Sequence, residues 1–131
     1  MIAFTVYGRP VPQGSMKAFV RGGRAVVTSD NAGLENWRLC VSRAANEAGR
    51  GSRVDGGESW HVTLLFVFER PKSDKNRSLP NVRPDLDKLC RAILDGITDG
   101  GLIHDDAQVV GLRAEKLYGT PERCEIEVRV V

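Results

Sequence analysis

Cysteine and histidine are both scarce in this chain of 131 residues. It contains three cysteines and two histidines. Cys40, Cys90 and Cys124 lie far apart and form no Cys-x-x-Cys pair, which excludes the usual zinc-binding spacings and argues against a disulfide framework. We expect each cysteine to behave as a small apolar residue in a reducing compartment.

The sequence also lacks a stretch that would place it in a membrane. Its longest apolar run, residues 62–68, has the length of a strand, whereas a membrane helix needs about 20 apolar residues. The first residues carry neither a charged leader nor the apolar core of an export signal. We therefore expect a cytoplasmic protein without membrane contact.

Acidic residues are missing from one part of the chain that is rich in bases. Residues 9–24 contain four basic residues and no acidic one, and residues 70–91 contain seven basic residues against three acidic ones. From Asp95 onward eight acids outnumber four bases, so a net charge of only +2 hides two basic patches. Such patches suit phosphate contacts with a polyanion, which need local positive charge. Solvated surface loops are the alternative explanation.

The pattern of elements predicts a single α+β domain over residues 1–131. We expect one mixed or antiparallel sheet with two helices packed on it. The expected elements are strands at 2–9, 60–68, 108–118 and 123–131, a hairpin at 17–28, and helices at 34–50 and 86–99. Residues 71–83 predict an exposed, mobile loop. Both faces of strand 60–68 are apolar in its middle, which predicts packing on each side.

Two pairs of aspartates flank the second predicted helix. Asp85 and Asp87 lie at its start, and Asp105 and Asp106 follow its end. If the next strand folds back alongside, the pairs converge, and two or three carboxylates suffice for a magnesium ion that keeps several waters. Beside a phosphodiester such an ion polarises a phosphoryl oxygen and lowers the pKa of its bound water. On spacing alone, helix capping and ordinary turn formation stay the more common explanations.

Three segments resemble the core signature of the RusA family of Holliday-junction resolvases. They are RPDLDKL at 83–89, AILDGI at 92–97 and LIHDDAQVV at 102–110. The family pattern is an Asp-x-Asp opening a helix, an Asp-Ala-like step late in that helix, and an Asp-Asp-x-Gln-Val entering a strand. The opening VYGRPVPQG at 6–14 also resembles the first strand and turn of many phage members.

The resemblance implies a homodimer that binds four-way DNA junctions and resolves them by paired, symmetric nicks during recombination and repair. It implies Mg²⁺ as the cofactor, with Mn²⁺ as a substitute, and Asp85, Asp87 and Asp106 as the metal ligands and catalytic carboxylates. Asp105 stands beside them as a weaker candidate. We expect no nucleotide cofactor, because the Gly-Gly pairs at 22–23 and 56–57 lack the context of phosphate-binding loops.

Two residues depart from the family pattern. Lys88 stands where an asparagine is usual, and Arg91 stands in place of the catalytic lysine. Arginine keeps the positive charge but cannot give up a proton, so Arg91, or the adjacent Lys88, can replace that lysine only if the position acts electrostatically. If the position requires a general acid, we expect catalysis to be impaired. The departures leave two alternatives open: an inactive protein of the same fold that binds structured DNA, and a magnesium nuclease acting on other branched DNA.

Basic residues in two segments of the chain and on the second helix are the expected phosphate contacts. They are Lys17, Arg21 and Arg24 on the predicted hairpin, Lys72, Lys75 and Arg77 in the loop, and Lys88 on the second helix. His61 and His104 are expected to have no catalytic role.

Overall fold

The fold was analysed in a computed structural model of the chain, which describes residues 1–14, 16–29, 33–52, 56–74 and 76–131. Of residues 16–21 and 24–29 only the backbone is described. The strands are β1 (Ile2–Tyr7), β2 (Met16–Arg21), β3 (Arg24–Ser29), β4 (Trp60–Phe68), β5 (Val109–Tyr118) and β6 (Arg123–Val130). The helices are α1 (Leu34–Ala48) and α2 (Leu86–Asp99), and a 3-10 turn, η1 (Asp106–Gln108), precedes β5. This order of elements confirms the prediction.

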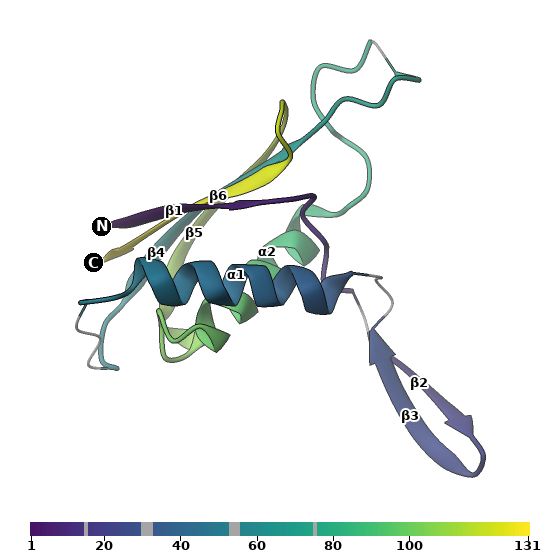
Figure 1. Cartoon of the computed structure of the whole chain (residues 1–131), viewed down its shortest axis with the longest axis horizontal. Helices are drawn as coiled ribbons and strands as arrows, with labels where there is room; N and C mark the ends of the chain where they lie inside the picture. Colours follow the sequence, from purple (N-terminus) through teal and green to yellow (C-terminus); the bar gives the residue numbers. More distant parts are fainter. Residues whose placement is uncertain (15, 30–32, 53–55, 75) are drawn as a thin grey trace.

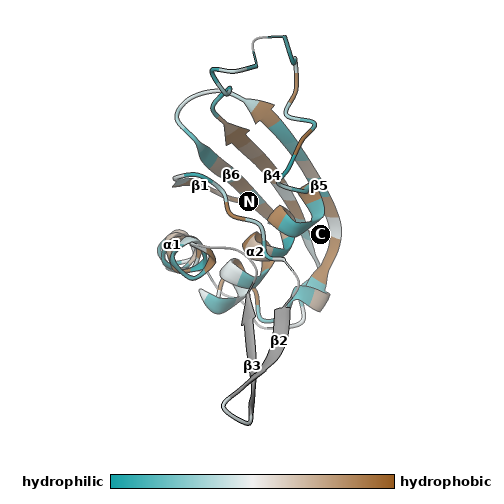
Figure 2. Ribbon diagram, turned by 90° about the vertical axis from the view of Figure 1, so that its right-hand side faces the viewer, coloured by the Kyte–Doolittle hydropathy of each residue, from teal (hydrophilic) through white to brown (hydrophobic). Residues whose placement is uncertain are grey.

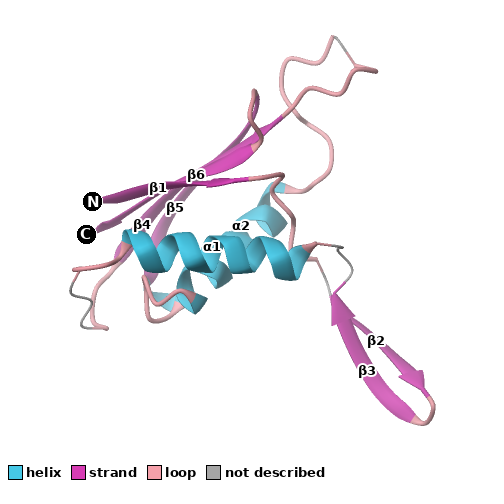
Figure 3. Cartoon of the chain, viewed as in Figure 1, coloured by secondary structure: helices cyan, strands magenta, loops and turns pink. Residues whose placement is uncertain are grey.

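Four strands form one mixed sheet in the order β1-β6-β4-β5. β4 runs parallel to β5 and antiparallel to β6, and β6 runs antiparallel to β1. Both helices lie on the same face of this sheet (Figure 1, Figure 3). The arrangement confirms the predicted α+β class. β2 and β3 pair only with each other and project away from the body as a two-stranded arm (Figure 1).

The core lies between the two helices and the sheet. α1 buries Trp37 and Val41, and α2 buries Leu89, Ile93 and Ile97, at helical spacing. They pack against the inward side chains of the central strands, chiefly Val62, Leu64, Phe66, Ile126 and Val128. α1 and α2 approach closely at Gly96, where an added Cβ would lie 2.6 Å from Val41 Cγ1. Glycine at this position therefore sets where α2 and its carboxylates lie.

The second face of β4 is not packed as the sequence predicted. Thr63 is exposed and Leu65 is half-buried, and in the described part of the chain no helix covers this side of the sheet (Figure 2). The prediction of packing on both sides is wrong for these residues. Val67 on the same face is buried, because the turn between β5 and β6 covers it: an added Cβ at Gly119 would lie 2.9 Å from Val67 Cγ1.

The three cysteines are free, but they differ in burial. Cys90 and Cys124 are buried, as expected of small apolar residues, whereas Cys40 is exposed on α1 and does not fit that expectation. That residue falls on the solvent side of an amphipathic helix. Burial raises the pKa of the Cys90 thiol to about 11 and also raises the pKa of Cys124. None of the helices described is both long and apolar enough to cross a membrane.

Candidate active site

A solvent-open hollow lies between α2 and β5, and three of the predicted catalytic residues line it. Asp87 and Arg91 come from α2, and Asp106 comes from η1. The remaining wall is apolar and consists of Leu86, Cys90, Leu94, Leu112 and Ala114. The chain folds back after α2 as the sequence suggested, which brings Asp106 to the helix that carries Asp87.

Asp85 lies at the start of α2 and is not among the residues that line the hollow. Its backbone is extended, and its carbonyl oxygen accepts the first helical hydrogen bond, from Leu89 N at 3.1 Å. Its side chain makes no capping hydrogen bond and instead lies 3.6 Å from the ammonium of Lys88. The geometry therefore does not support the view that Asp85 is present only to cap the helix.

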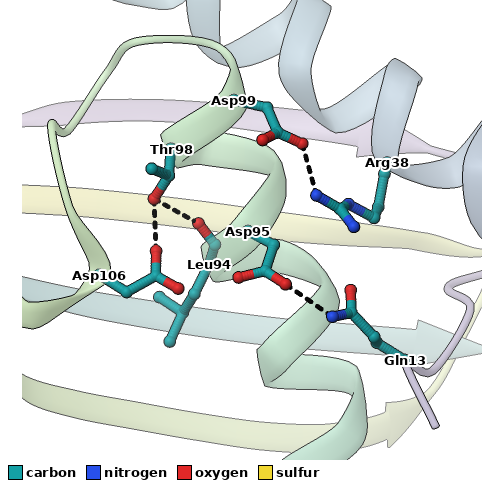
Figure 4. Close-up of polar contacts among 7 residues, drawn as sticks. All are labelled: Gln13, Arg38, Leu94, Asp95, Thr98, Asp99 and Asp106. Atoms are coloured by element: carbon teal, nitrogen blue, oxygen red, sulfur yellow. Dashed lines mark hydrogen bonds and ion pairs between the residues drawn. The ribbon is translucent and has the colours of Figure 1, made fainter. Parts of the chain in front are cut away.

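Asp105 and Asp106 have different surroundings although they are adjacent. Asp105 caps η1: its carboxylate accepts from Ala107 N at 2.9 Å, and Gln108 Oε1 accepts from Asp105 N at 3.0 Å. This capping box engages Asp105 in the turn and directs the side chain of Asp106 toward α2. There the hydroxyl of Thr98 lies within hydrogen-bond reach of both the Asp106 carboxyl group and the Leu94 carbonyl oxygen (Figure 4).

Asp95 lies in the 92–97 segment of the family signature, was assigned no role from the sequence, and contacts Asp106 in the structure. Its carboxyl group lies against that of Asp106. Gln13 Nε2 donates a hydrogen bond to Asp95 Oδ2 at 2.6 Å (Figure 4). Burial raises the pKa of Asp106, and the adjoining Asp95 raises it further, against the opposing effect of the Thr98 hydroxyl. One signal was available, because Asp87, Arg91 and Asp95 follow one another at i, i+4 and i+8 on one face of α2.

The basic residues predicted to bind DNA fall into three groups. Lys72 is exposed in the loop between β4 and α2, and Lys88 is half-buried beside Asp85. Arg77 is half-buried in that same loop, where its guanidinium forms a 2.6 Å ion pair with Asp74. The side chains of the remaining four predicted contacts lie outside the described residues: Lys17, Arg21, Arg24 and Lys75.

The loop that contains Lys72 and Arg77 has internal order. Asp74 Oδ1 accepts from the backbone N–H groups of Asn76 and Arg77, both at 3.2 Å. Arg70 stacks over the Tyr118 ring at 4.6 Å and donates to the carbonyl oxygen of Arg77. The loop is exposed, as predicted, and these contacts tie it to the end of β5.

The donor set suits a hard cation that is held partly by water. Among the residues that the structure describes, no three His, Cys, Asp or Glu side chains lie close enough to form a complete metal cage. Magnesium does not need one, since it commonly binds through one or two carboxylates and keeps several waters. The carboxyl groups of Asp95 and Asp106 adjoin each other, and the pKa of Asp106 is raised. A bound cation would offset the repulsion between the two negative charges.

Comparison with known families identifies the family of the chain. The family model of endodeoxyribonuclease RusA matches residues 8–129. The chain belongs to the RusA endodeoxyribonuclease family. Membership confirms the enzyme class predicted from the sequence, a hydrolase of the Holliday-junction-resolvase type that acts on DNA phosphodiester bonds. It also carries the general requirement of such nucleases for a divalent metal ion, and binding to branched DNA.

Two relatives are similar over most of this RusA-family chain. The uncharacterized protein YqaN of Bacillus subtilis (strain 168) is 29% identical over 140 residues, covering 99% of this chain and 96% of the relative. The crossover junction endodeoxyribonuclease rusA of Lactococcus phage r1t is 28% identical over 102 residues, covering 78% of this chain and 76% of the relative.

Proposed function

We propose that this RusA-family protein is a magnesium-dependent resolvase that cuts four-way DNA junctions by paired, symmetric nicks. The observation that carries the proposal is the convergence of Asp87, Arg91 and Asp106, from two separate elements, on one hollow open to solvent. We assign Asp85, Asp87 and Asp106 as metal ligands and Arg91 as the catalytic cation. Mg²⁺ is the expected ion because the donors are all carboxylates, and Mn²⁺ should substitute.

Each residue has a distinct part in this scheme. The three aspartates would hold a magnesium ion, which would supply an activated water and polarise the scissile phosphate. Asp106 is oriented by the Thr98 hydroxyl, whereas Asp87 is exposed at the first turn of α2. Arg91 lines the same hollow and is placed to stabilise negative charge that develops on the phosphoryl oxygens. Because arginine does not release its proton, Arg91 cannot protonate the leaving oxygen, and that proton would come from water or from the Lys88 ammonium.

Two nicks on strands of like polarity require two sites related by a two-fold axis, so we propose a homodimer. Lys72 is exposed in the loop before α2, Lys88 lies within ion-pair distance of Asp85, and the β2–β3 arm projects away from the body (Figure 1). The arm carries Lys17, Arg21 and Arg24, and its proposed role is to bind the phosphates of a second duplex arm of the junction. Arg77 and Lys75 complete the proposed phosphate contacts.

The direct test is incubation with a labelled four-way junction of fixed sequence, a flap and a linear duplex, in magnesium or in excess chelator. We expect symmetric nicks in the junction alone, and only with magnesium or manganese. Equal cutting of flap and junction would favour a broader branched-DNA nuclease. Undiminished cutting in chelator would exclude the metal mechanism.

A second candidate is a protein of the same fold that binds branched DNA without cutting it. Arg91 in the lysine position favours this candidate. An Arg91→Lys variant separates the two: it should gain cutting if the native chain is inactive, and should change the rate only modestly if Arg91 already acts by charge alone.

A further inference from the structure

We propose that Lys116 is a positioning residue of the active site, which fixes the segment leading into α2 and thereby the place of Asp85 and Asp87. The inference rests on the proposed function, because these two carboxylates are the expected metal ligands at the start of the helix. Neither the family signature nor the charge pattern points to Lys116.

Lys116 lies on β5, on the side of the strand turned toward α2. Leu112 and Ala114, which share that side, line the active-site hollow. The Lys116 side chain is half-buried, and its ammonium donates hydrogen bonds to the carbonyl oxygens of Val82 and Pro84, each at 2.8 Å. These distances are those of strong, charge-assisted hydrogen bonds.

The two acceptors belong to the last residues before Asp85. Because they stand on either side of Arg83, a single ammonium fixes the orientation of two peptide groups, which one hydrogen bond would not do. On the other side of Asp85 the helix begins with the bond from Leu89 N to Asp85 O. Asp85 is thus held between β5 and the first turn of α2.

Asp85 depends on such backbone restraint because its side chain is weakly tethered. It makes no capping hydrogen bond, and its ion pair with Lys88 spans 3.6 Å with both groups about half exposed to water. The described residues that precede it, 69–74 and 76–84, belong to no helix or strand. Without an anchor at its end, such a loop would leave the first carboxylate of the site free to shift.

The alternative role for a lysine beside a nuclease site is a direct phosphate contact. The Lys116 ammonium is turned to two protein carbonyls, whereas Arg91 lines the hollow itself. The two roles predict different consequences. A positioning residue sets the order of residues 80–87 even without metal or DNA, and a phosphate contact changes junction affinity and its salt dependence.

The experiment compares Lys116→Met and Lys116→Arg, with Arg113→Gln as the matched control. Arg113 lies on the same strand but on the opposite face, and its side chain is 78% exposed. Amide hydrogen exchange of peptides covering 79–89 is measured in metal-free protein, and kcat, KM and the magnesium concentration for half-maximal cutting follow on a junction. We expect the amides of residues 79–89 to lose protection from exchange in Lys116→Met. We expect kcat to fall about 100-fold, as a shift of the carboxylates by about 1 Å would cause. The affinity for the junction should be unchanged.

Lys116→Arg, which keeps two donors, should restore protection and most of the rate, and Arg113→Gln should resemble wild type. Should Lys116→Met fail to fold, Lys116→Gln takes its place with the same expectations. Unchanged exchange in 79–89 would overturn the inference, and so would a loss of junction affinity with a reduced salt slope. If wild type itself does not cut, the proposed function fails, while the exchange measurement still decides whether Lys116 holds the segment.

Discussion

The two ends of α2 hold their carboxylates in opposite ways. At the start, Asp85 and Asp87 are exposed, and no side-chain hydrogen bond caps the helix. At the far end, Asp106 is half-buried against the last turn, beside Asp95 and the Thr98 hydroxyl. The start offers carboxylates that water and substrate can reach, and the far end offers one that is already oriented.

Electrostatics deepens the contrast. The N-terminal end of a helix carries partial positive charge, so Asp85 and Asp87 are favoured there, whereas carboxylates near the C-terminal end oppose the helix dipole. The last turn of α2 contains no basic residue. Arg38 of α1 forms an ion pair with Asp99, with 2.7 Å between the guanidinium nitrogen and the carboxylate oxygen. The side chains of Asp95 and Asp106 adjoin each other. A cluster that violates a local rule is expected at a functional site, where a cation supplies the missing charge.

The strongest test of this contrast is Asp106→Asn, which should lower cutting and raise stability together. Removing the carboxylate should reduce the cleavage rate by at least about 100-fold, since even outer-shell partners of metal ligands typically cost 10–100-fold. The same change removes a charge that opposes the helix dipole, so Tm should rise by about 1–4 °C. Nicking of a labelled junction and thermal unfolding provide the two measurements.

Asp99→Asn is the matched control for that experiment. It also removes a carboxylate from the last turn, but one that Arg38 already neutralises. Its Tm should not rise, and it should cut normally. If Asp106→Asn cuts at the wild-type rate, the far end of α2 is not part of the metal site.

At the start of α2, Asp85→Asn and Asp85→Ala should behave alike. Both should lose cutting by about 10–100-fold, because each removes an anionic oxygen. Because Asp85 makes no capping bond, Ala should not cost the additional ~1 kcal/mol that loss of a true cap would cause. Urea unfolding and junction nicking check the two parts.

Glu35→Gln provides the control for Asp85, since Glu35 occupies the first turn of α1 and is exposed. It removes the same favourable interaction with a helix dipole, and cutting should be unchanged. A variant Asp85→Ala that is destabilised but has a normal rate per folded molecule would establish capping as the role of Asp85.

Thr98 tests whether the orientation of Asp106 matters, as distinct from its charge. Thr98→Val keeps the shape of the side chain and removes the hydroxyl, and it should raise the magnesium concentration for half-maximal cutting about tenfold. Thr98→Ser restores the hydroxyl and should restore the response. Thr63→Val, at an exposed position on the open face of the sheet, is the control. Equal magnesium responses in Thr98→Val and wild type would contradict a positioning role.

The aspartates at both ends of α2 were predictable from the sequence, and the contacts that orient them were not. Helical periodicity and the glycines after α2 located the helix, and the family signature selected Asp85, Asp87 and Asp106. Asp95 belongs to the family signature, but nothing in the sequence indicated a role or a partner for its side chain. Its partner Gln13 lies 82 positions away in the sequence, so only the tertiary fold brings them together.

Other omissions have similar physical causes. Lys116 bonds to backbone carbonyls, which every residue possesses, so no pattern of side chains marks its acceptors. Leu65 on β4 suggested a covered second face because apolar residues favour burial, yet it lies among strands that shield it only partly. Local propensity therefore predicted the helices and strands well. The hydrogen-bond and packing partners that lie far apart in the sequence could not be predicted from it.

The smallest expected effect concerns Cys90, whose pKa reports the electrostatic influence of the exposed Asp87 carboxylate on the interior side of α2. Burial, and to a smaller extent the charge of Asp87, raises the pKa of Cys90 from 9.0 to about 11. Asp87→Asn should lower that pKa and speed alkylation of Cys90 at pH 9 by about threefold or less, since one partly solvated charge acts weakly. Asp106→Asn should leave the rate unchanged, because the charge at the far end contributes nothing to this shift. Exposed Cys40 serves as the internal reference in peptide-resolved alkylation.

The sign of the linked stability change follows from the same shift. A thiol whose pKa is higher in the folded state binds its proton more tightly there, so its contribution is complete below the unfolded pKa near 9 and is lost as the pH rises toward 11. Wild type should therefore lose stability over this window, and Cys90→Ala should show a flatter profile there. If Asp106→Asn accelerates Cys90 alkylation as much as Asp87→Asn does, the charge of Asp106 acts on Cys90 as strongly as that of Asp87, and the contrast between an exposed and an oriented carboxylate would have to be abandoned.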